Sequence, residues 1–474
     1  MKTKMSNFLR IEVLSLALCI IFLAGNGHAQ TKQGSIVSLE QAQQDFINLG
    51  FGMFIHFNMS TYMNDDWADP SVPPAIFNPK KLNAEQWAKA AKSANMTYGC
   101  LTTKHHNGFA IWDTKTTDYN VMNSPLKKDV VKEYVNAFRK QNLGVSLYYS
   151  ILDVHHNIRP GYITPVHINM IKQQLTELLT NYGEINSLII DGWDAPWSRI
   201  SYDDVPFEEI YRLIKSIQPN CLVMDLNAAK YPSEALFYTD IKSYEQGAGQ
   251  HISKENNRLP ALACLPLQAN WFWKESFPTT AVKSPEKMIN ENAIPYNQIY
   301  CNFLLNVAPN RDGLIDENAL EALKEMGKLY KPGSPLPKFP GGPAPIISSN
   351  IAKFKPANGS WSSDMNIMDF ATDDNFGTSW VSNPSIKNPW LEVDLQKDQR
   401  FNMIVITERE PNITKYRLEY FINGVWRPLI TGTETSRVKI HRFDNSWGSK
   451  VRILIEGYKN VPSIAEFGIY NERR

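Results

Sequence analysis

The sequence predicts an α/β fold, a (β/α)₈ barrel of the TIM type, followed by an all-β sandwich. Between residues 50 and 330, eight apolar strand-like runs alternate with amphipathic stretches of helical period. A proline- and glycine-rich segment follows at residues 331–345, and beyond it short strand-like runs recur without helices. A chain of 474 residues is long enough for these two domains.

The runs that predict the barrel strands are short and mostly apolar. They are Phe51–Phe57, Tyr98–Thr103, Gly144–Ser150, Ser187–Asp191, Cys221–Leu226, Phe237–Ile241, Ala261–Leu265 and Cys301–Val307. Helical periodicity between them predicts helices over Asn83–Ala94 (with Asn83 as N-cap), Asp129–Lys140, Ile168–Tyr182 and Phe207–Ile217. A doubly wound sheet is the alternative, but no Gly-rich phosphate-binding turn follows the first run.

The second domain follows the linker at residues 331–345, where proline and glycine disfavour helix and sheet. We therefore assign residues 30–330 to the barrel and residues 346–474 to the sandwich. The strands expected in the sandwich are Trp390–Leu395, Asn402–Ile406, Tyr416–Ile422, Arg437–Ile440 and Lys450–Ile455.

The first 29 residues have the pattern of a cleavable signal peptide. Lys2, Lys4 and Arg10 precede an apolar run at residues 13–24, and residues 27–29 (Gly-His-Ala) offer a small-x-small cleavage site. The apolar run is too short for a membrane span, and no later segment approaches twenty apolar residues. The sequence therefore predicts a secreted or periplasmic protein without a membrane span.

Composition excludes several classes of partner and cofactor. A net charge of +1 argues against nucleic-acid or acidic-membrane partners, which require a basic excess. The four cysteines after the signal peptide are widely spaced, lie in or beside apolar runs and show no C-x-x-C pattern, which predicts buried free thiols rather than disulfides or a zinc site. We expect no cofactor.

Polar side chains cluster where the predicted barrel strands end. They are His56, Lys104, His105, His106, Tyr148, Tyr149, Asp191, Asp225, Asn227 and Asp240. Barrel enzymes carry their active site at the carboxyl ends of the strands, so this shared phase predicts a single site. Asp191 is the principal candidate because it ends the apolar run Ser187–Asp191 and is followed by Gly and Trp; a helix cap is the alternative role.

The residue types favour sugar chemistry over a metal centre. Adjacent residues of a strand point to opposite faces, so His105 and His106 do not easily share one ion, and no H-E-x-x-H motif is present. Imidazole and ammonium donors among aromatic residues suit the binding of sugar hydroxyls, although structural histidines are the alternative. Hydrolysis of a glycosidic bond needs two carboxyl groups, and Asp191 is the natural first of them.

Several motifs resemble the α-L-fucosidases of glycoside hydrolase family 29 over about residues 40–330. They are residues 51–57 (Phe-Gly-Met-Phe-Ile-His-Phe), 104–109 (Lys-His-His-Asn-Gly-Phe), 117–120 (Thr-Asp-Tyr-Asn), 147–150 (Leu-Tyr-Tyr-Ser) and 306–313 (Asn-Val-Ala-Pro-Asn-Arg-Asp-Gly). The resemblance implies a retaining mechanism with Asp191 as the nucleophile. It also implies that His56, His105, His106 and Tyr148 bind the fucose hydroxyls, and that Trp271 or Trp273 packs against the methyl face of the sugar.

At the position of the acid/base residue, this sequence differs from one branch of the family, which carries a Glu directly after a Pro-Ala pair. Here Leu262 follows Pro260 and Ala261, and an apolar side chain cannot donate a proton. We take Glu245 as the substitute because it follows the sixth predicted strand among glycines, and Asp240 and Glu275 are weaker candidates. A surface-loop role for Glu245 is the alternative.

The C-terminal domain resembles the coagulation-factor 5/8 type C (discoidin-like) fold, which family 32 carbohydrate-binding modules share. Residues 373–380 and 390–395 carry this likeness. Some relatives bind structural calcium through an acidic loop, which makes Asp373 and Asp374 candidate ligands. Trp380 and Trp390 are candidates for sugar contact or for the core, and a packing role for the domain is equally open.

The function expected from these features is that of a retaining exo-α-L-fucosidase acting on glycans with terminal α-L-fucose. Two alternatives stay open at this point. One is a carbohydrate-binding protein on a catalytically lapsed barrel, suggested by Leu262. The other is a hydrolase of a related sugar such as an α-L-galactoside. Linkage preference, leaving sugar and oligomeric state are open.

Overall fold

The computed structural model describes residues 35–230, 238–252, 257–341, 345–346 and 348–472. The predicted signal peptide lies outside the described residues, so it stays a prediction. Within the described ranges, no helix is both long and apolar enough to cross a membrane. The four cysteines of the described residues are buried free thiols, as predicted.

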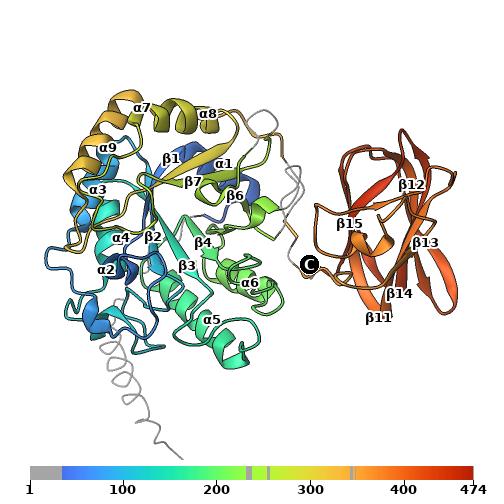
Figure 1. Ribbon diagram of the computed structural model, residues 1–474, viewed down its shortest axis with the longest axis horizontal. Coiled ribbons are helices and arrows are strands. Elements are labelled where there is room, and N and C mark those ends of the chain that lie inside the picture. Colours follow the sequence, from blue (N-terminus) through green and yellow to red (C-terminus); the bar gives the residue numbers. More distant parts are fainter. Residues whose placement is uncertain (1–34, 231–237, 253–256, 342–344, 347, 473–474) are drawn as a thin grey trace, which may run out of the picture. The chain divides into compact units, whose positions relative to one another are not determined.

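Eight parallel strands form a closed barrel in chain order, and β8 returns to pair with β1 (Figure 1). The strands are β1 Phe51–Ile55, β2 Tyr98–Lys104, β3 Gly144–Ser150, β4 Ser187–Asp191, β5 Leu222–Asp225, β6 Ile241–Glu245, β7 Ala261–Pro266 and β8 Cys301–Asn306. Side chains of alternate residues fill the interior, including Phe54, Tyr98, Ile189 and Leu304. This interior is therefore a packed core that closes the barrel beneath its carboxyl end.

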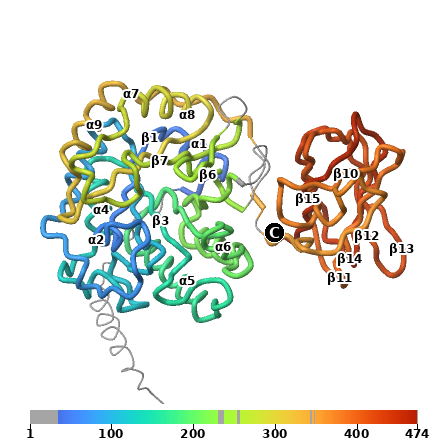
Figure 2. Tube along the Cα trace, viewed as in Figure 1, coloured from blue at the N-terminus to red at the C-terminus, as the bar shows by residue number. Residues whose placement is uncertain are grey.

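Helices surround the barrel, and the chain passes around it once from blue to yellow in Figure 2. They are α1 Leu39–Leu49, α2 Ser60–Met63, α3 Ala84–Ser93, α4 Val130–Lys140, α5 Pro165–Thr180, α6 Phe207–Ile217, α7 Pro285–Lys287, α8 Ile294–Asn297 and α9 Glu317–Leu329. A π-helical stretch, Met288–Ala293, joins α7 to α8. The predicted cap Asn83 accepts a hydrogen bond from the Gln86 amide at 3.0 Å, and Asp129 caps α4 in the same way.

The predicted sixth strand was wrong in position. The prediction placed it at Phe237–Ile241, whereas β6 runs over Ile241–Glu245; Phe237 itself lies outside the described residues. Along β6, Ile241 and Glu245 point into the barrel, and the residues that alternate with them face the helices. Because β6 carries buried polar residues, it does not form the continuous apolar run on which the prediction relied. Glu245 therefore ends a strand at the barrel mouth, so it is not a surface-loop residue.

Asp240 consequently lies at the opposite, amino end of β6. Its carboxylate accepts hydrogen bonds from the Tyr211 hydroxyl at 2.7 Å and the Val223 amide at 2.8 Å, and it pairs with Lys215 at 2.7 Å. This carboxylate is a buried structural group, so it cannot serve as the acid/base at the mouth.

The C-terminal domain is antiparallel and all-β. Its strands are β9 Ala357–Gly359, β10 Trp380–Val381, β11 Trp390–Glu408, β12 Ile413–Ile422, β13 Val425–Gly432, β14 Val438–Tyr458 and β15 Ser463–Tyr470. The sequence predicted short separate strands where β11 and β14 each run unbroken. A register shift between Asp394 and Gln399 lets β11 continue through an exposed polar stretch that resembles a turn. Trp380 is fully buried in the domain core.

Candidate active site

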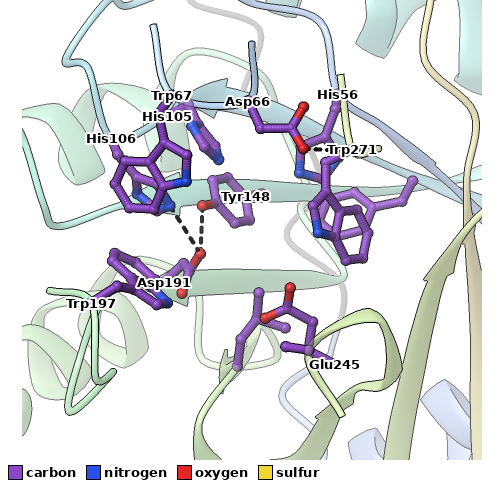
Figure 3. Close-up of a pocket in the computed structure, with 13 residues that line it drawn as sticks. His56, Asp66, Trp67, His105, His106, Tyr148, Asp191, Trp197, Glu245 and Trp271 are labelled. Atoms are coloured by element: carbon purple, nitrogen blue, oxygen red, sulfur yellow. Dashed lines mark hydrogen bonds and ion pairs between the residues drawn. The ribbon is translucent and has the colours of Figure 1, made fainter. Parts of the chain in front are cut away.

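A pocket of about 210 Å³ opens at the carboxyl end of the barrel, where the shared phase of the polar residues predicted a site (Figure 3). Its lining residues come from the ends of the strands and the loops after them. They are Phe54, His56, Asp66, Trp67, His105, His106, Tyr148, Asp191, Trp197, Leu226, Glu245, Ala248 and Trp271.

Asp191 ends β4 at the centre of the pocket. Its Oδ2 accepts a hydrogen bond from the Tyr148 hydroxyl at 2.6 Å and lies 3.8 Å from Nε2 of His106. Its other oxygen, Oδ1, is buried and has no hydrogen-bond partner among the groups that the structure describes. One carboxylate oxygen is thus held in place while the other stays available to react, as a nucleophile requires.

The environment of Asp191 tunes its protonation. Burial raises the pKa of Asp191 to about 6, although hydrogen bonds from Tyr148 and the Gly192 amide act in the opposite direction. The carboxylate is therefore ionised at neutral pH but poorly solvated. A carboxylate in this state gains from bonding to an electrophilic carbon.

Glu245 ends β6 and lines the same pocket, two strands from Asp191 (Figure 3). Burial, followed by the negative charge of Asp191, raises the pKa of Glu245 to about 7, whereas a hydrogen bond from the Trp271 side chain lowers it. A carboxyl group that keeps its proton beside an ionised carboxylate is the arrangement that general-acid catalysis needs. The two environments thus separate the roles of the two acids.

His56 and His106 are held as neutral imidazoles. Burial lowers the pKa of His56 to about 4 and that of His106 to about 3. The Asn306 amide group donates to the Trp271 carbonyl at 2.7 Å, so its oxygen accepts from Nδ1 of His56, also at 2.7 Å. In the same way the Ser150 hydroxyl donates to the Leu152 carbonyl, so it accepts from Nδ1 of His106 at 2.7 Å. Both rings therefore keep Nε2 as a hydrogen-bond acceptor.

His105 lies between these two rings, 3.9 Å from His106 and 5.9 Å from His56 between ring centroids. Burial also lowers the pKa of His105, well below its ordinary value. The predicted sugar-binding residues His56, His105, His106 and Tyr148 are all brought together in the pocket. Among the described residues, no group of three or more His, Cys, Asp or Glu side chains is placed to hold a metal ion.

Of the two predicted tryptophans, the pocket takes Trp271 and not Trp273. Trp271 lies 5.1 Å from His56 and 6.0 Å from Phe54 between ring centroids, and together they form an aromatic wall. Trp273 is buried instead beneath this loop, where its indole N–H donates to Asp316 at 2.6 Å. Of the two candidates, Trp271 is therefore the one that lines the pocket.

Asp66 fixes the loop that carries Trp271. Its carboxylate accepts from the backbone amides of Trp271 at 3.3 Å and Phe272 at 3.2 Å, and it pairs with Lys274 at 2.9 Å. Sequence reasoning missed Asp66, Trp67 and Trp197, because each stands in a loop with no strand end to mark it. In the sequence, Asp66 and Trp67 form an acidic-aromatic pair, but such pairs are too common to mark a site.

Two other positions considered for the acid/base role, Leu262 and Glu275, do not line the pocket. Leu262 is near the start of β7 and is buried in the barrel interior, paired in register with Ser243. Because Leu262 has no carboxyl group and does not line the pocket, any proton donor must come from another position. Glu275 is exposed and pairs with Arg311 at 2.6 Å, which leaves Glu245 as the candidate that lines the pocket.

A buried charge network supports the loop with His105 and His106. Lys104 pairs with Asp153 at 3.1 Å, and both side chains are fully buried. Burial alone would raise the pKa of Asp153, but Lys104 and His156 hold it below its usual value. The backbone amide of Val154 in turn donates to the His106 carbonyl at 2.9 Å. The network thus ties the loop that carries His105 and His106 to the loop after β3.

The acidic loop of the C-terminal domain is satisfied by protein groups. Asp374 pairs with Lys353 at 2.8 Å, and Asp373 accepts from the Thr378 hydroxyl at 2.7 Å and the Asn375 amide at 3.0 Å. No metal-binding group of three acidic, His or Cys side chains occurs in the described part of this domain. The structure therefore adds no support to the calcium site suggested by the resemblance.

A closed parallel barrel whose mouth holds two buried carboxyl groups among imidazole and aromatic side chains has the architecture of a glycoside hydrolase. Comparison with known proteins identifies which one. The family model described as alpha-L-fucosidase matches residues 65–332, and the model for the F5/8 type C domain matches residues 350–467. The chain belongs to the alpha-L-fucosidase family and carries an F5/8 type C domain.

Individual relatives agree with this assignment. The chain is 28% identical to alpha-L-fucosidase 1 of Arabidopsis thaliana, over 92% of this chain and 88% of the relative. It is 26% identical to the putative alpha-L-fucosidase 1 of Oryza sativa subsp. japonica, over 89% and 82%. The solved structure of alpha-L-fucosidase isoenzyme 1 from Paenibacillus thiaminolyticus shares the fold, with a TM-score of 0.54 and 23% identity over 90% of this chain and all of that one.

Proposed function

We propose that the protein removes terminal α-L-fucose from glycans with retention of anomeric configuration, using Asp191 as nucleophile and Glu245 as acid/base. One observation carries this proposal. The free Oδ1 of Asp191 and the raised pKa of Glu245 occur in one pocket, which is otherwise lined by neutral hydrogen-bonding and aromatic side chains.

In the first step, Oδ1 of Asp191 attacks the anomeric carbon and forms a covalent ester. Glu245 gives its proton to the glycosidic oxygen as the bond from that oxygen to the anomeric carbon breaks. The hydrogen bond from Tyr148 to Oδ2 holds the carboxylate plane during the attack. Because Asp191 then loses its negative charge, the pKa of Glu245 falls after this step.

In the second step, water replaces the leaving group. The ionised Glu245 takes a proton from this water, whose oxygen attacks the anomeric carbon on the face opposite Asp191. The ester bond breaks, and Asp191 is regenerated as a carboxylate. Two inversions at one carbon give net retention, so the first product is α-L-fucose.

The sugar is held by groups of complementary type. Nε2 of His56 and of His106 are available to accept hydrogen bonds from fucose hydroxyls. Trp271 and Phe54 form the apolar wall against which the methyl group of fucose packs.

The direct test is hydrolysis of an aryl α-L-fucoside, followed by proton NMR of the sugar as it is released. We expect the α anomer first, with the β anomer appearing only through mutarotation. If the β anomer appeared first, the mechanism would be a single displacement with inversion. If an aryl α-L-galactoside were cleaved faster than the fucoside, the preferred substrate would be the galactoside.

The activity should have a bell-shaped pH profile. Asp191 must be ionised, so kcat/KM falls below its pKa of about 6; Glu245 must be protonated, so kcat/KM falls above its pKa of about 7. We expect a maximum between these values for an unactivated fucoside. With α-L-fucosyl fluoride, which needs no proton donor, the alkaline limb of kcat/KM should be absent already in the unaltered enzyme. A limb that persists with this substrate would assign the upper pKa to another group.

We also propose that the enzyme is exported. The support is the basic, apolar and small-residue order of residues 2–29. Amino-terminal sequencing of protein from the producing cells should begin at Gln30, and a chain that retains Met1 would contradict export by this route.

A further inference from the structure

The backbone around Glu245 is fixed by hydrogen bonds with the loop that follows β6. The Glu245 amide donates to Oε1 of Gln250 at 3.0 Å, and the Gln250 amide donates to the Glu245 carbonyl at 3.2 Å. The next side chain, Gln246, accepts from the Tyr296 hydroxyl at 2.9 Å. None of these bonds reaches the Glu245 carboxyl group, so another contact must set its orientation.

That contact comes from Trp271, whose side chain donates a hydrogen bond to the Glu245 carboxyl group. A Cβ atom placed on Gly247 would lie 3.5 Å from Cζ2 and 4.0 Å from Cε2 of Trp271. The edge of the indole that carries the N–H therefore packs against the chain directly after Glu245. Figure 3 shows Trp271 and Glu245 on the same side of the pocket, away from His106.

Trp271 is itself held at its backbone and at its ring. Its amide donates to Asp66 at 3.3 Å, and its carbonyl accepts from the side chain of Asn306 at 2.7 Å. Its ring lies 5.1 Å from that of His56 between centroids. Because Asn306 ends β8 and His56 follows β1, these contacts tie the indole to the barrel. Its N–H is therefore a preorganised donor rather than the end of a free side chain.

An indole N–H donates a hydrogen bond and cannot accept one. The oxygen of the protonated Glu245 that receives this N–H is therefore the carbonyl oxygen, and the proton is on the other oxygen. We propose that Trp271 is a positioning residue for the acid/base, and that its N–H holds Glu245 with the protonated oxygen facing the glycosidic bond. In the second step the same N–H stabilises the ionised form. This proposal rests on the proposed fucosidase function and adds a second task to a residue of the apolar wall.

The test replaces Trp271 with phenylalanine, which removes the N–H and keeps an aromatic wall for the sugar. Trp271→Phe should lower kcat/KM for a fucosyl disaccharide roughly tenfold more than for α-L-fucosyl fluoride, because only the disaccharide needs the proton of Glu245. A weaker hold on the fucose ring would lower both rates equally, so the ratio isolates the proton donor.

The pH profile gives a second measurement on the same variant. The N–H favours the ionised carboxyl group, so its loss raises the pKa of Glu245. The alkaline limb of kcat/KM for the disaccharide should therefore move to higher pH in Trp271→Phe.

Two further variants test whether Trp271 acts through Glu245. In Glu245→Gln, adding Trp271→Phe should cause no further loss specific to the disaccharide, because the proton that Trp271 positions is already absent. Trp273→Phe is the matched control, since it removes the indole N–H of the neighbouring tryptophan, which donates to Asp316. This control should leave the ratio of the two rates and the alkaline limb unchanged.

Equal losses of Trp271→Phe on both substrates would overturn the proposal, as would an alkaline limb that stays in place or moves to lower pH. A disaccharide-specific loss that persists undiminished in the Glu245→Gln background would overturn it too. Failure of the fucosidase function is separate, since the unaltered enzyme would then cleave neither substrate. Failure of Glu245 as the acid would appear in Glu245→Gln alone, as a uniform loss on both substrates.

Discussion

Replacing Asp191 with alanine should lower kcat on an aryl α-L-fucoside by at least about 10⁴-fold, because the covalent step loses its nucleophile. The variant should still fold, since alanine removes a poorly solvated carboxylate whose Oδ1 makes no hydrogen bond within the described part of the protein. Steady-state kinetics with a nitrophenyl fucoside measures the loss. Asp113→Ala, at an exposed aspartate paired with Lys115, is the control and should keep full activity.

Azide distinguishes a lost nucleophile from a damaged fold. In Asp191→Ala the side chain leaves space for this small anion on the face opposite the leaving group. With an activated aryl fucoside, we expect azide to restore turnover and to give β-L-fucosyl azide, the inverted product. Full activity without azide, or an α-azide product, would contradict the role of Asp191.

Replacing Glu245 with glutamine should lower kcat/KM on a fucosyl disaccharide by about 10²- to 10⁴-fold, the usual contribution of general acid–base catalysis. The loss on α-L-fucosyl fluoride should be far smaller, since fluoride departs without a proton. The ratio of the two losses is the measurement that separates a proton donor from a structural residue. A uniform loss on both substrates would remove the acid role from Glu245.

Two further results make the assignment of Glu245 specific. Azide added to Glu245→Ala should attack the covalent intermediate and give α-L-fucosyl azide, the opposite anomer to that from Asp191→Ala. Glu275→Gln, in the exposed ion pair with Arg311, should leave the disaccharide rate unchanged. A large loss in that control would mean that the proton donor had been misassigned.

The barrel was predictable because its strands are buried on both faces and so form continuous apolar runs. The sixth strand escaped this search because it carries Lys242, Ser243 and Glu245. A polar strand is costly to bury, and here one of those residues, Glu245, lines the pocket. In the C-terminal domain, the same reliance on apolar runs led to the prediction of two strands where β11 continues through its exposed polar stretch.

The sequence allowed prediction of those pocket residues that lie at or near the ends of strands. His56 and His105 directly follow strands, and Tyr148 and Asp191 lie near or at the ends of strands; parallel strands bring such positions to one end of the barrel. Asp66 and Trp197 belong to loops whose course depends on tertiary contacts, such as the hydrogen bonds that hold Asp66 to the distant amide of Trp271. Local sequence carries no trace of such contacts, so only the folded chain reveals them.

The most direct measurement is trapping of the covalent intermediate. A 2-deoxy-2-fluoro-α-L-fucosyl fluoride forms the glycosyl ester quickly but releases it slowly, because the fluorine at C2 destabilises the positively charged transition state of the second step. Peptide mapping by mass spectrometry should find the fluorosugar on Asp191, in the peptide that contains the end of β4. A label on any other residue, or turnover without a covalent adduct, would contradict the assignment of Asp191 as nucleophile.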